Sequence, residues 1–271
     1  MKSKLTVIIV AVVLVAVIAA GVIFLPGLLN KDDDNAVPID SGEMVKVWLL
    51  GGFTASDIDG HSISEAKAEY DEKHNIKRVT YYVDDTVANV IDVEYDSDNR
   101  IVAMLYTSEG QRIQSNEYKY NENGKVSERI FIAGSTEQPK ASIKTEYIYN
   151  ENNVLIKSVE GDKTTLYECN ENGLRVKETV YSGDELYNYS VYEYDSNGNI
   201  KSRVTYSSSN TETMRYTYEY DSNNSLTKYA IADNQGINTF YFSDYACVEV
   251  SPEQAEALNR QQKFFTIGYI E

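Results

Sequence analysis

Apolar and aromatic residues alternate with polar residues through most of the chain after residue 44. Met214 and Tyr216 fall on one side of an extended segment, and Arg215 and Thr217 fall on the other. A spacing of two is the period of a β-strand that turns one face toward a core. A second alternating segment, such as residues 200–206, follows each polar loop, so the pattern predicts pairs of strands joined as hairpins.

The hairpin pattern recurs roughly every 25 residues, a period typical of repeat architectures. The copies are AEYDEKHNI from Ala68, VEYDSDNRI from Val93, YKYNENGKV from Tyr118, YIYNENNVL from Tyr147, YECNENGLR from Tyr167, YEYDSNGNI from Tyr192 and YEYDSNNSL from Tyr218. Further turn-forming clusters separate the copies at residues 108–110, 161–162, 182–184 and 207–210. We therefore predict an all-β fold, in which residues 44–245 form an antiparallel array of about seven hairpin copies, curved or rolled as a meander sheet.

Each copy has a loop that begins with Asp or Asn: Asp71, Asp96, Asn121, Asn150, Asn170, Asp195 and Asp221. Three residues later stand His74, Asn99, Gly124, Asn153, Gly173, Gly198 and Asn224. Asp and Asn side chains accept hydrogen bonds from backbone groups two residues on, while Gly, Asn and, less often, His tolerate left-handed backbone angles. The pattern predicts a type I turn closed by a left-handed residue.

The alternating oxygens of Asp195, Asn197 and Asn199 also resemble part of a calcium loop. An EF-hand loop needs Gly at its sixth position and Glu at its twelfth, where this chain has Ile200 and Tyr206. We therefore predict a turn without a metal, and calcium binding is the lesser alternative.

The N-terminal region contains an uncharged apolar run over residues 5–25. As a helix this run is roughly 30 Å long, enough to cross a bilayer. Lysines precede it and aspartates follow it, which leaves the short N-terminus in the cytoplasm. We predict that residues 1–29 are a transmembrane helix that serves as membrane anchor or signal segment and that residues 30–43 are an acidic stalk. The body is then extracytoplasmic, at the cell surface; a cleaved signal peptide is the alternative to an anchor.

Residues 246–271 are predicted to form a C-terminal cap on the array. Ser251 suits an N-cap before Pro252, which predicts a short helix from Pro252 to Gln262, followed by a strand in FTIGYIE. Repeat arrays need such a cover over their open ends. The alternative is a partner-binding helix, anchored by Leu258, Phe264 and Phe265.

Charge and composition narrow the classes of partner. The chain has 42 acidic and 25 basic residues and a net charge of -17, which excludes a typical nucleic-acid-binding surface. Its 23 tyrosines favour β-sheets that are partly exposed to water, because Tyr combines a β-forming apolar ring with a polar tip. Cys169 and Cys247 are the two cysteines of the sequence, and they form neither a disulfide scaffold nor a zinc motif.

The copies, above all RYTYEYDSNNSL and YEYDSNGNI, resemble the YD repeats of Rhs-type bacterial surface proteins. The NENGKV form at Asn121 is also similar to MORN-variant repeats. The first resemblance covers the chain from Tyr70 to about Leu226 and implies extracellular β-hairpins wound into a curved or spiral sheet. It also implies a role in surface interaction and carbohydrate binding. This chain departs from the family at Cys169, which stands where the fifth Tyr is expected, and at Arg175, where an aliphatic residue is expected.

Known catalytic and nucleotide-binding motifs are absent from the sequence, which has two histidines and no GxSxG, HExxH, GxGxxG or Walker motif. We therefore predict a non-catalytic protein that binds no cofactor. A cell-envelope hydrolase that uses two carboxylates from different hairpins is a lesser alternative.

A membrane-anchored binding or adhesion module for glycan or cell-wall ligands is the function that the pattern favours. The segment YNYSVY changes the phase of the alternation, so its aromatic residues cannot all face inward. The candidate ligand-binding residues are Tyr187, Tyr189 and Tyr192, which would stack on sugar rings. The alternative is a structural or immunity-like subunit that presents its acidic sheet to a basic protein.

Overall fold

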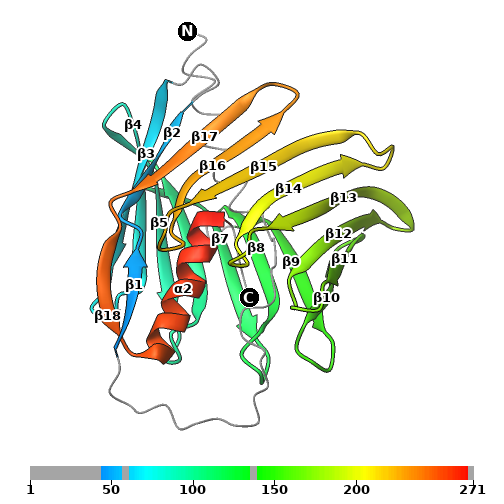
Figure 1. Cartoon of the computed structure of the whole chain (residues 1–271), viewed down its shortest axis with the longest axis horizontal. Helices are drawn as coiled ribbons and strands as arrows, with labels where there is room; N and C mark the ends of the chain where they lie inside the picture. Colours follow the sequence, from blue (N-terminus) through cyan, green and yellow to red (C-terminus); the bar gives the residue numbers. More distant parts are fainter. Residues whose placement is uncertain (1–43, 57–60, 135–138, 268–271) are drawn as a thin grey trace.

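A computed structural model describes residues 44–56, 61–134 and 139–267 (Figure 1). Its strands are β1 (Val45–Leu49), β2 (Gly52–Ser56), β3 (Ser62–Tyr70), β4 (Ile76–Val83), β5 (Thr86–Tyr95), β6 (Ile101–Ser108), β7 (Gln111–Tyr120), β8 (Val126–Gly134), β9 (Pro139–Tyr149), β10 (Leu155–Glu160), β11 (Lys163–Cys169), β12 (Arg175–Ser182), β13 (Glu185–Tyr194), β14 (Ile200–Ser207), β15 (Glu212–Tyr220), β16 (Leu226–Asp233), β17 (Ile237–Ser243) and β18 (Ala246–Val250). The helix is α2 (Pro252–Ile267).

Strands β2 to β17 form a closed antiparallel barrel in which each strand pairs with its neighbours in the sequence. The two ends of the meander meet where β17 pairs with β2, with Phe242 opposite Phe53 and Ser243 opposite Gly52. Strands β1 and β18 pair with each other as a separate two-stranded sheet. The predicted all-β hairpin meander is therefore confirmed, and its sheet is closed.

The seven repeat loops adopt the predicted turn. The left-handed residue of each has a positive φ: His74 (65°), Asn99 (58°), Gly124 (72°), Asn153 (57°), Gly173 (74°), Gly198 (79°) and Asn224 (60°). In the loop of the sixth copy, Asp195 Oδ1 accepts the backbone N–H groups of Asn197 and Asn199, each at 2.9 Å. Asp195 Oδ2 accepts a third bond, from Asn199 Nδ2 at 3.0 Å. The carboxylate thus holds its own loop, which is the role that turn chemistry predicts.

Asn residues at the left-handed position also join neighbouring loops. Asn153 Oδ1 accepts from Asn123 Nδ2 at 2.8 Å, and Asn224 Oδ1 accepts from Asn197 Nδ2 at 2.9 Å. In both cases the donor is the third residue of the preceding loop. A Gly at this position has no side chain to accept such a bond, which gives a physical reason for Asn in some copies.

We predict that Asp195→Asn reduces the acid sensitivity of folding. Burial acts to raise the pKa of Asp195, but hydrogen bonds from Asn199 and Asn197 outweigh it, and the pKa is lowered. A depressed pKa in the folded state contributes stability above the unfolded pKa of about 3.9, and this stability is lost as the pH falls through the folded pKa. The free energies of unfolding of wild type and Asp195→Asn, measured from pH 7 to pH 2.5, should therefore differ by a constant amount above about pH 5 and approach each other as the pH falls from about 4 toward 2.5.

Asp184→Asn, in a turn between copies, is the control for this titration. A gap between the Asp195→Asn and wild-type curves that stays constant down to pH 2.5 would contradict the prediction.

The turns between copies lie at the opposite end of the hairpins. Asp84 and Asp85 both have positive φ, as do Glu109 and Gly110, which is the pattern of type I′ turns. Gly161 and Gly183 belong to two other tight turns, with φ of 60° and 58°. The clusters predicted from the sequence as second turns are confirmed as turns.

A tyrosine row joins the second, third, fourth and sixth copies to the copy before each of them. The row consists of the residues that precede the repeat loops, Tyr70, Tyr95, Tyr120, Tyr149, Cys169, Tyr194 and Tyr220, together with Tyr245. Hydroxyl groups of the row donate to backbone carbonyls as Tyr70 to Leu50, Tyr95 to Ile76, Tyr120 to Ile101, Tyr149 to Val126, Tyr194 to Arg175 and Tyr245 to Leu226, at 2.6 to 2.8 Å. Each acceptor after Leu50 directly follows a repeat loop. Each of these tyrosines therefore binds the backbone of the preceding hairpin.

The tyrosine row extends past the seven copies at one end and is interrupted at one position. Tyr245 continues the row by one position beyond the seven copies, next to the strand that closes the barrel. Cys169 interrupts the row, since a thiol at this position is too short to reach across as a phenol does. Burial raises the pKa of Tyr70 to about 12, so its hydroxyl stays a donor at neutral pH.

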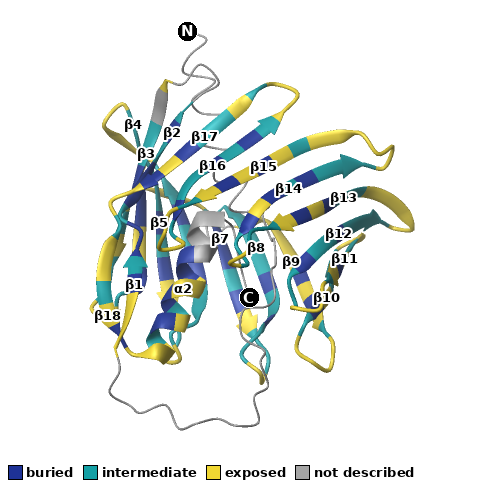
Figure 2. Ribbon diagram, viewed as in Figure 1, coloured by how far each residue is buried: buried dark blue, intermediate teal, exposed yellow. Residues whose placement is uncertain are grey.

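The hydrophobic core consists of the side chains on one face of the barrel sheet. Buried and exposed residues alternate along the strands, as Figure 2 shows. On the side of the seam, Phe53, Phe240 and Phe242 pack together, and Tyr229 stacks on Phe240 at 5.4 Å. The alternation predicted from the sequence is therefore the alternation between the core face and the outer face.

Helix α2 begins where the sequence predicts. Ser251 Oγ accepts the N–H of Gln254 at 3.3 Å as an N-cap, and Leu258 is fully buried against β1 and β18. The helix continues to Ile267, so its predicted end at Gln262 is wrong, as is the strand predicted for FTIGYIE over residues 265–267. The first helix-breaking residue after Pro252 is Gly268, which leaves the helix no local reason to stop earlier.

Glutamines of α2 hold the helix against the barrel rim that carries the repeat loops. Gln261 Oε1 accepts from the Ile76 N–H and its Nε2 donates to Asn75 Oδ1 at 2.8 Å. Gln262 Oε1 accepts from the Leu50 N–H at 2.8 Å. The helix therefore lies over the loop end of the first copy. The predicted C-terminal helix is confirmed, but the open end of the array that it was expected to cover does not exist, because β17 pairs with β2.

The predicted anchor (residues 1–29) and stalk (residues 30–43) lie outside the described residues. Within the described part of the chain, no helix has the length and apolar character needed to span a membrane.

Candidate functional site

An aromatic patch lies on β13 and β14. We define it as Tyr189 and Tyr206, which pair on the outer face, together with the exposed Tyr187 of the same strand as Tyr189. The rings of Tyr189 and Tyr206 stack across the two strands, with centroids 5.1 Å apart and planes 18° apart. Tyr187 is 59% exposed, the highest value among the described large hydrophobic residues. The patch therefore presents aromatic rings to solvent.

A β-bulge lies at the start of YNYSVY. Asn188 pairs with Val180 and Leu186 pairs with Tyr181, so Tyr187 has no partner in the register. Residues 188–192 pair regularly, so Tyr189 and Tyr192 lie on opposite faces because they stand three residues apart. The prediction of aromatic residues on both faces is confirmed, but no phase change within residues 188–192 causes it.

Lysine side chains lie beside the aromatic patch. Lys177 Nζ is 5.7 Å from the centroid of Tyr189, and Lys163 Nζ is 5.8 Å from that of Tyr187. Tyr189 Oη donates to Asn210 Oδ1 at 3.2 Å. The rings are thus held in place by contacts along their edges and faces.

Tyr192 does not belong to the aromatic patch, so its predicted exposure is wrong. It lies on the core face, 4% exposed, and its hydroxyl donates to Glu178 Oε2 at 2.8 Å. Because it stands three residues after Tyr189 in the same strand, it faces the opposite side of the wall. A ligand on the outer face cannot reach it.

An ionic cluster lies on the core face around Glu178. Glu178 Oε1 accepts from Arg203 Nη2 at 2.7 Å, and Arg175 Nη1 lies 3.5 Å from Glu178 Oε2. The Arg175 guanidinium also stacks on Tyr167 at 4.0 Å. Glu178 and both arginines are largely buried, so the cluster satisfies charges within the wall. Arg175 thereby has a structural role at the position where the repeat pattern predicts an aliphatic residue.

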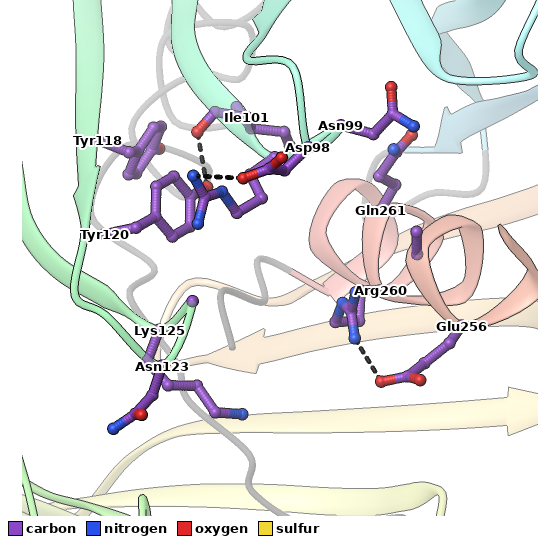
Figure 3. A pocket seen from close by; sticks show the side chains of 13 residues that line it. Asp98, Asn99, Ile101, Tyr118, Tyr120, Asn123, Lys125, Glu256, Arg260 and Gln261 are labelled. Carbon is purple, nitrogen blue, oxygen red and sulfur yellow. Dashed lines mark hydrogen bonds and ion pairs between the residues drawn. The ribbon is translucent and has the colours of Figure 1, made fainter. Parts of the chain in front are cut away.

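A rim pocket of about 380 Å³ opens between α2 and the loops of the second and third copies (Figure 3). Tyr120 lines it, with the Arg100 guanidinium 4.7 Å above its ring. Asn123 and Lys125 line it from the third loop, and Arg260 lines it from the helix. The pocket combines an aromatic ring with amide and charged side chains, a composition that suits a polar ligand.

Two cations of the rim pocket have acidic partners. Arg100 Nε donates to Asp96 Oδ2 at 2.7 Å, a hydrogen bond that raises the pKa of Arg100. Arg260 pairs with Glu256 one turn away on α2. Asp98 also lines the pocket and pairs with Arg100 at 3.0 Å. Within the described ranges, Lys125 has no acidic partner, so its charge is left for a ligand.

We identify no candidate metal site or catalytic centre among the described residues. Among them no group of three or more His, Cys, Asp or Glu side chains could hold a metal ion. His74 closes the first repeat loop with φ of 65°. Cys169 and Cys247 are both free thiols.

Comparison with known proteins gives distant likenesses. No protein-family model and no curated protein matches the chain. A porin-like protein from Bacteroides uniformis is 12% identical, with 72% of this chain and 97% of that chain covered and a TM-score of 0.44. A porin-like protein from Bacteroides vulgatus is 11% identical over 72% and 97% of the two chains, with a TM-score of 0.37. The Tc holotoxin pore of Photorhabdus luminescens is 10% identical over 67% of this chain and 14% of that chain, with a TM-score of 0.31. These values assign neither a family nor a function.

Sequence reasoning missed the rim pocket. Arg100 and Lys125 share the fifth loop position of adjacent copies, which is visible when the copies are written one under another. The contribution of Arg260 is not visible there, because it depends on where α2 lies against the rim.

Proposed function

We propose that this chain is a non-catalytic, extracytoplasmic binding module that takes glycan or cell-wall ligands on the aromatic patch. The observation that carries the proposal is the stacked, half-buried pair Tyr189 and Tyr206 on the outer face, with the exposed ring of Tyr187 on the same strand as Tyr189. Aromatic rings held on a rigid sheet offer flat apolar faces to sugar rings at little entropic cost. Residues 1–29 would hold the module at the membrane, and the hairpin copies would place it among YD-repeat surface proteins.

Ion pairs on the outer face of the barrel support the placement of the module in water and not in lipid. Ion pairs join adjacent strands on this face, as between Arg78 and Asp92 at 2.6 Å and between Lys228 and Glu219 at 2.8 Å. An Arg or Lys that faces lipid at the midplane of a bilayer costs about 2–4 kcal/mol. We therefore assign membrane contact to the N-terminal segment and ligand contact to the barrel.

The test is a glycan and cell-wall binding screen with the full chain in mild detergent, at low and at high salt. We expect binding that persists at about 0.5 M salt, because stacking depends little on screening. Tyr187→Ala and Tyr206→Ala should each weaken it about fivefold to tenfold, as expected for the loss of one aromatic contact. Tyr241→Ala is the matched control, since Tyr241 is also exposed, at 47%, but lies on β17.

Two results would reject the proposal. One is the absence of glycan binding together with salt-sensitive capture of a basic protein. The other is a ligand that is cleaved during incubation, as shown by mass spectrometry, since the module is proposed to be non-catalytic.

A further inference from the structure

We propose that the rim pocket is a second binding site, specific for an acidic saccharide that presents a carboxylate to Lys125 and Arg260. The site is separate from the aromatic patch, because it lies at the loop end of β5 to β8 under α2.

The rim pocket has a cation without an acidic partner among the described residues because of one difference between adjacent loops. In the second copy, the cation at the fifth loop position, Arg100, binds the acid at the first position, Asp96, at 2.7 Å. In the third copy the cation is Lys125, but the first position holds the neutral Asn121. The turn is otherwise the same: Asn121 Oδ1 accepts from the backbone N–H of Lys125 at 2.9 Å, as Asp96 Oδ1 does from that of Arg100. The third copy therefore keeps its turn and leaves its ammonium group available to a ligand.

Helix α2 adds Arg260 to the same space. The neighbouring Gln261 and Gln262 bind the rim of the first copy, while Arg260 lines the pocket above the second and third copies. Figure 3 shows Arg260 across the pocket from Tyr120. Arg260 is half-exposed and pairs with Glu256 on its own helix, so its guanidinium keeps donors for a ligand carboxylate.

The aromatic side of the pocket favours a sugar over a simple anion. Arg100 and Tyr120 are stacked, which forms a flat platform on one wall. Amide side chains of Asn99 and Asn123 lie at the edge and can bond hydroxyl groups. A volume of about 380 Å³ is at the small end of the range for ligand sites and suits one or two sugar rings.

The decisive variant is Asn121→Asp, which supplies Lys125 with the acid that Arg100 already has. Titration calorimetry of the full chain in detergent would measure affinity for D-glucuronate, with D-glucose as the neutral match and inorganic phosphate as the simple anion. We expect glucuronate to bind more tightly than either, and Asn121→Asp to weaken its binding about tenfold, the loss of one charge-assisted contact. Arg260→Gln should weaken it similarly.

Asn150→Asp is the matched control, because its loop has Val154 at the fifth position and lies outside the pocket. We expect it to leave glucuronate binding unchanged, as should Tyr187→Ala, which tests the aromatic patch separately. The proposal is overturned if glucuronate does not bind, if Asn121→Asp has no effect, or if phosphate or glucose binds as tightly as glucuronate.

Discussion

Glu178→Ala lowers the free energy of unfolding by about 3–5 kcal/mol, the range for removing one partner from a buried ion pair. Glu178 accepts from Arg203 at 2.7 Å and from Tyr192 at 2.8 Å, and it lies 3.5 Å from Arg175. The substitution leaves two largely buried guanidinium groups without this carboxylate, and burial makes that loss costly. Chemical denaturation of the full chain in detergent measures the difference.

Glu219→Ala is the matched control for Glu178. Glu219 pairs with Lys228 at 2.8 Å, but its side chain is 63% exposed. An exposed pair contributes about 0–1 kcal/mol, so the control should lose far less stability. Equal losses in the two variants would show that the ionic cluster does not stabilise the barrel.

Gly52→Ala opens the seam of the barrel and costs about 3 kcal/mol, the upper range for overpacking. A Cβ at this position would lie 2.3 Å from the carbonyl oxygen of Ala66, a backbone atom that cannot move without shifting β3. The clash therefore lies between β2 and β3, and it displaces β2, which closes the sheet by pairing with β17 through Gly52 and Ser243. Hydrogen exchange should accelerate selectively in residues 52–56, 62–70 and 237–243.

Gly110→Ala separates this steric effect from a general cost of replacing glycine. Gly110 has φ of +74°, and a methyl group added there would meet no described atom within 4 Å, so its replacement costs backbone strain alone. We expect exchange at the seam to stay at the wild-type rate in Gly110→Ala. Unchanged exchange at the seam in Gly52→Ala would refute the role assigned to Gly52.

The repeat loops show what local sequence determines. Asp195 bonds to backbone groups two and four residues on, and Gly198 supplies the left-handed angle, so all parts of the turn lie within five residues. Such contacts form wherever the segment occurs. The loops, the hairpins and the N-cap at Ser251 were therefore predictable from the sequence.

The candidate sites were predictable only in part. Tyr187 is exposed and Tyr189 lies on the outer face, as predicted, but Tyr192 faces inward because it stands three residues after Tyr189 in a regular stretch of strand. The pattern indicated aromatic residues on both faces without showing which of them faces the core. The sequence contains no sign of the rim pocket except that Arg100 and Lys125 stand at the same loop position in adjacent copies.

By itself, the sequence determined the strands, the turns and the repeat, because these depend on alternation and on hydrogen bonds between near neighbours. Only the tertiary structure decided that the meander closes through β17 and β2, which face of β13 is buried, and where α2 meets the rim. These outcomes join residues far apart in the chain, such as Gly52 with Ser243 and Asn75 with Gln261. The free energy of such contacts exists only after the whole sheet has formed.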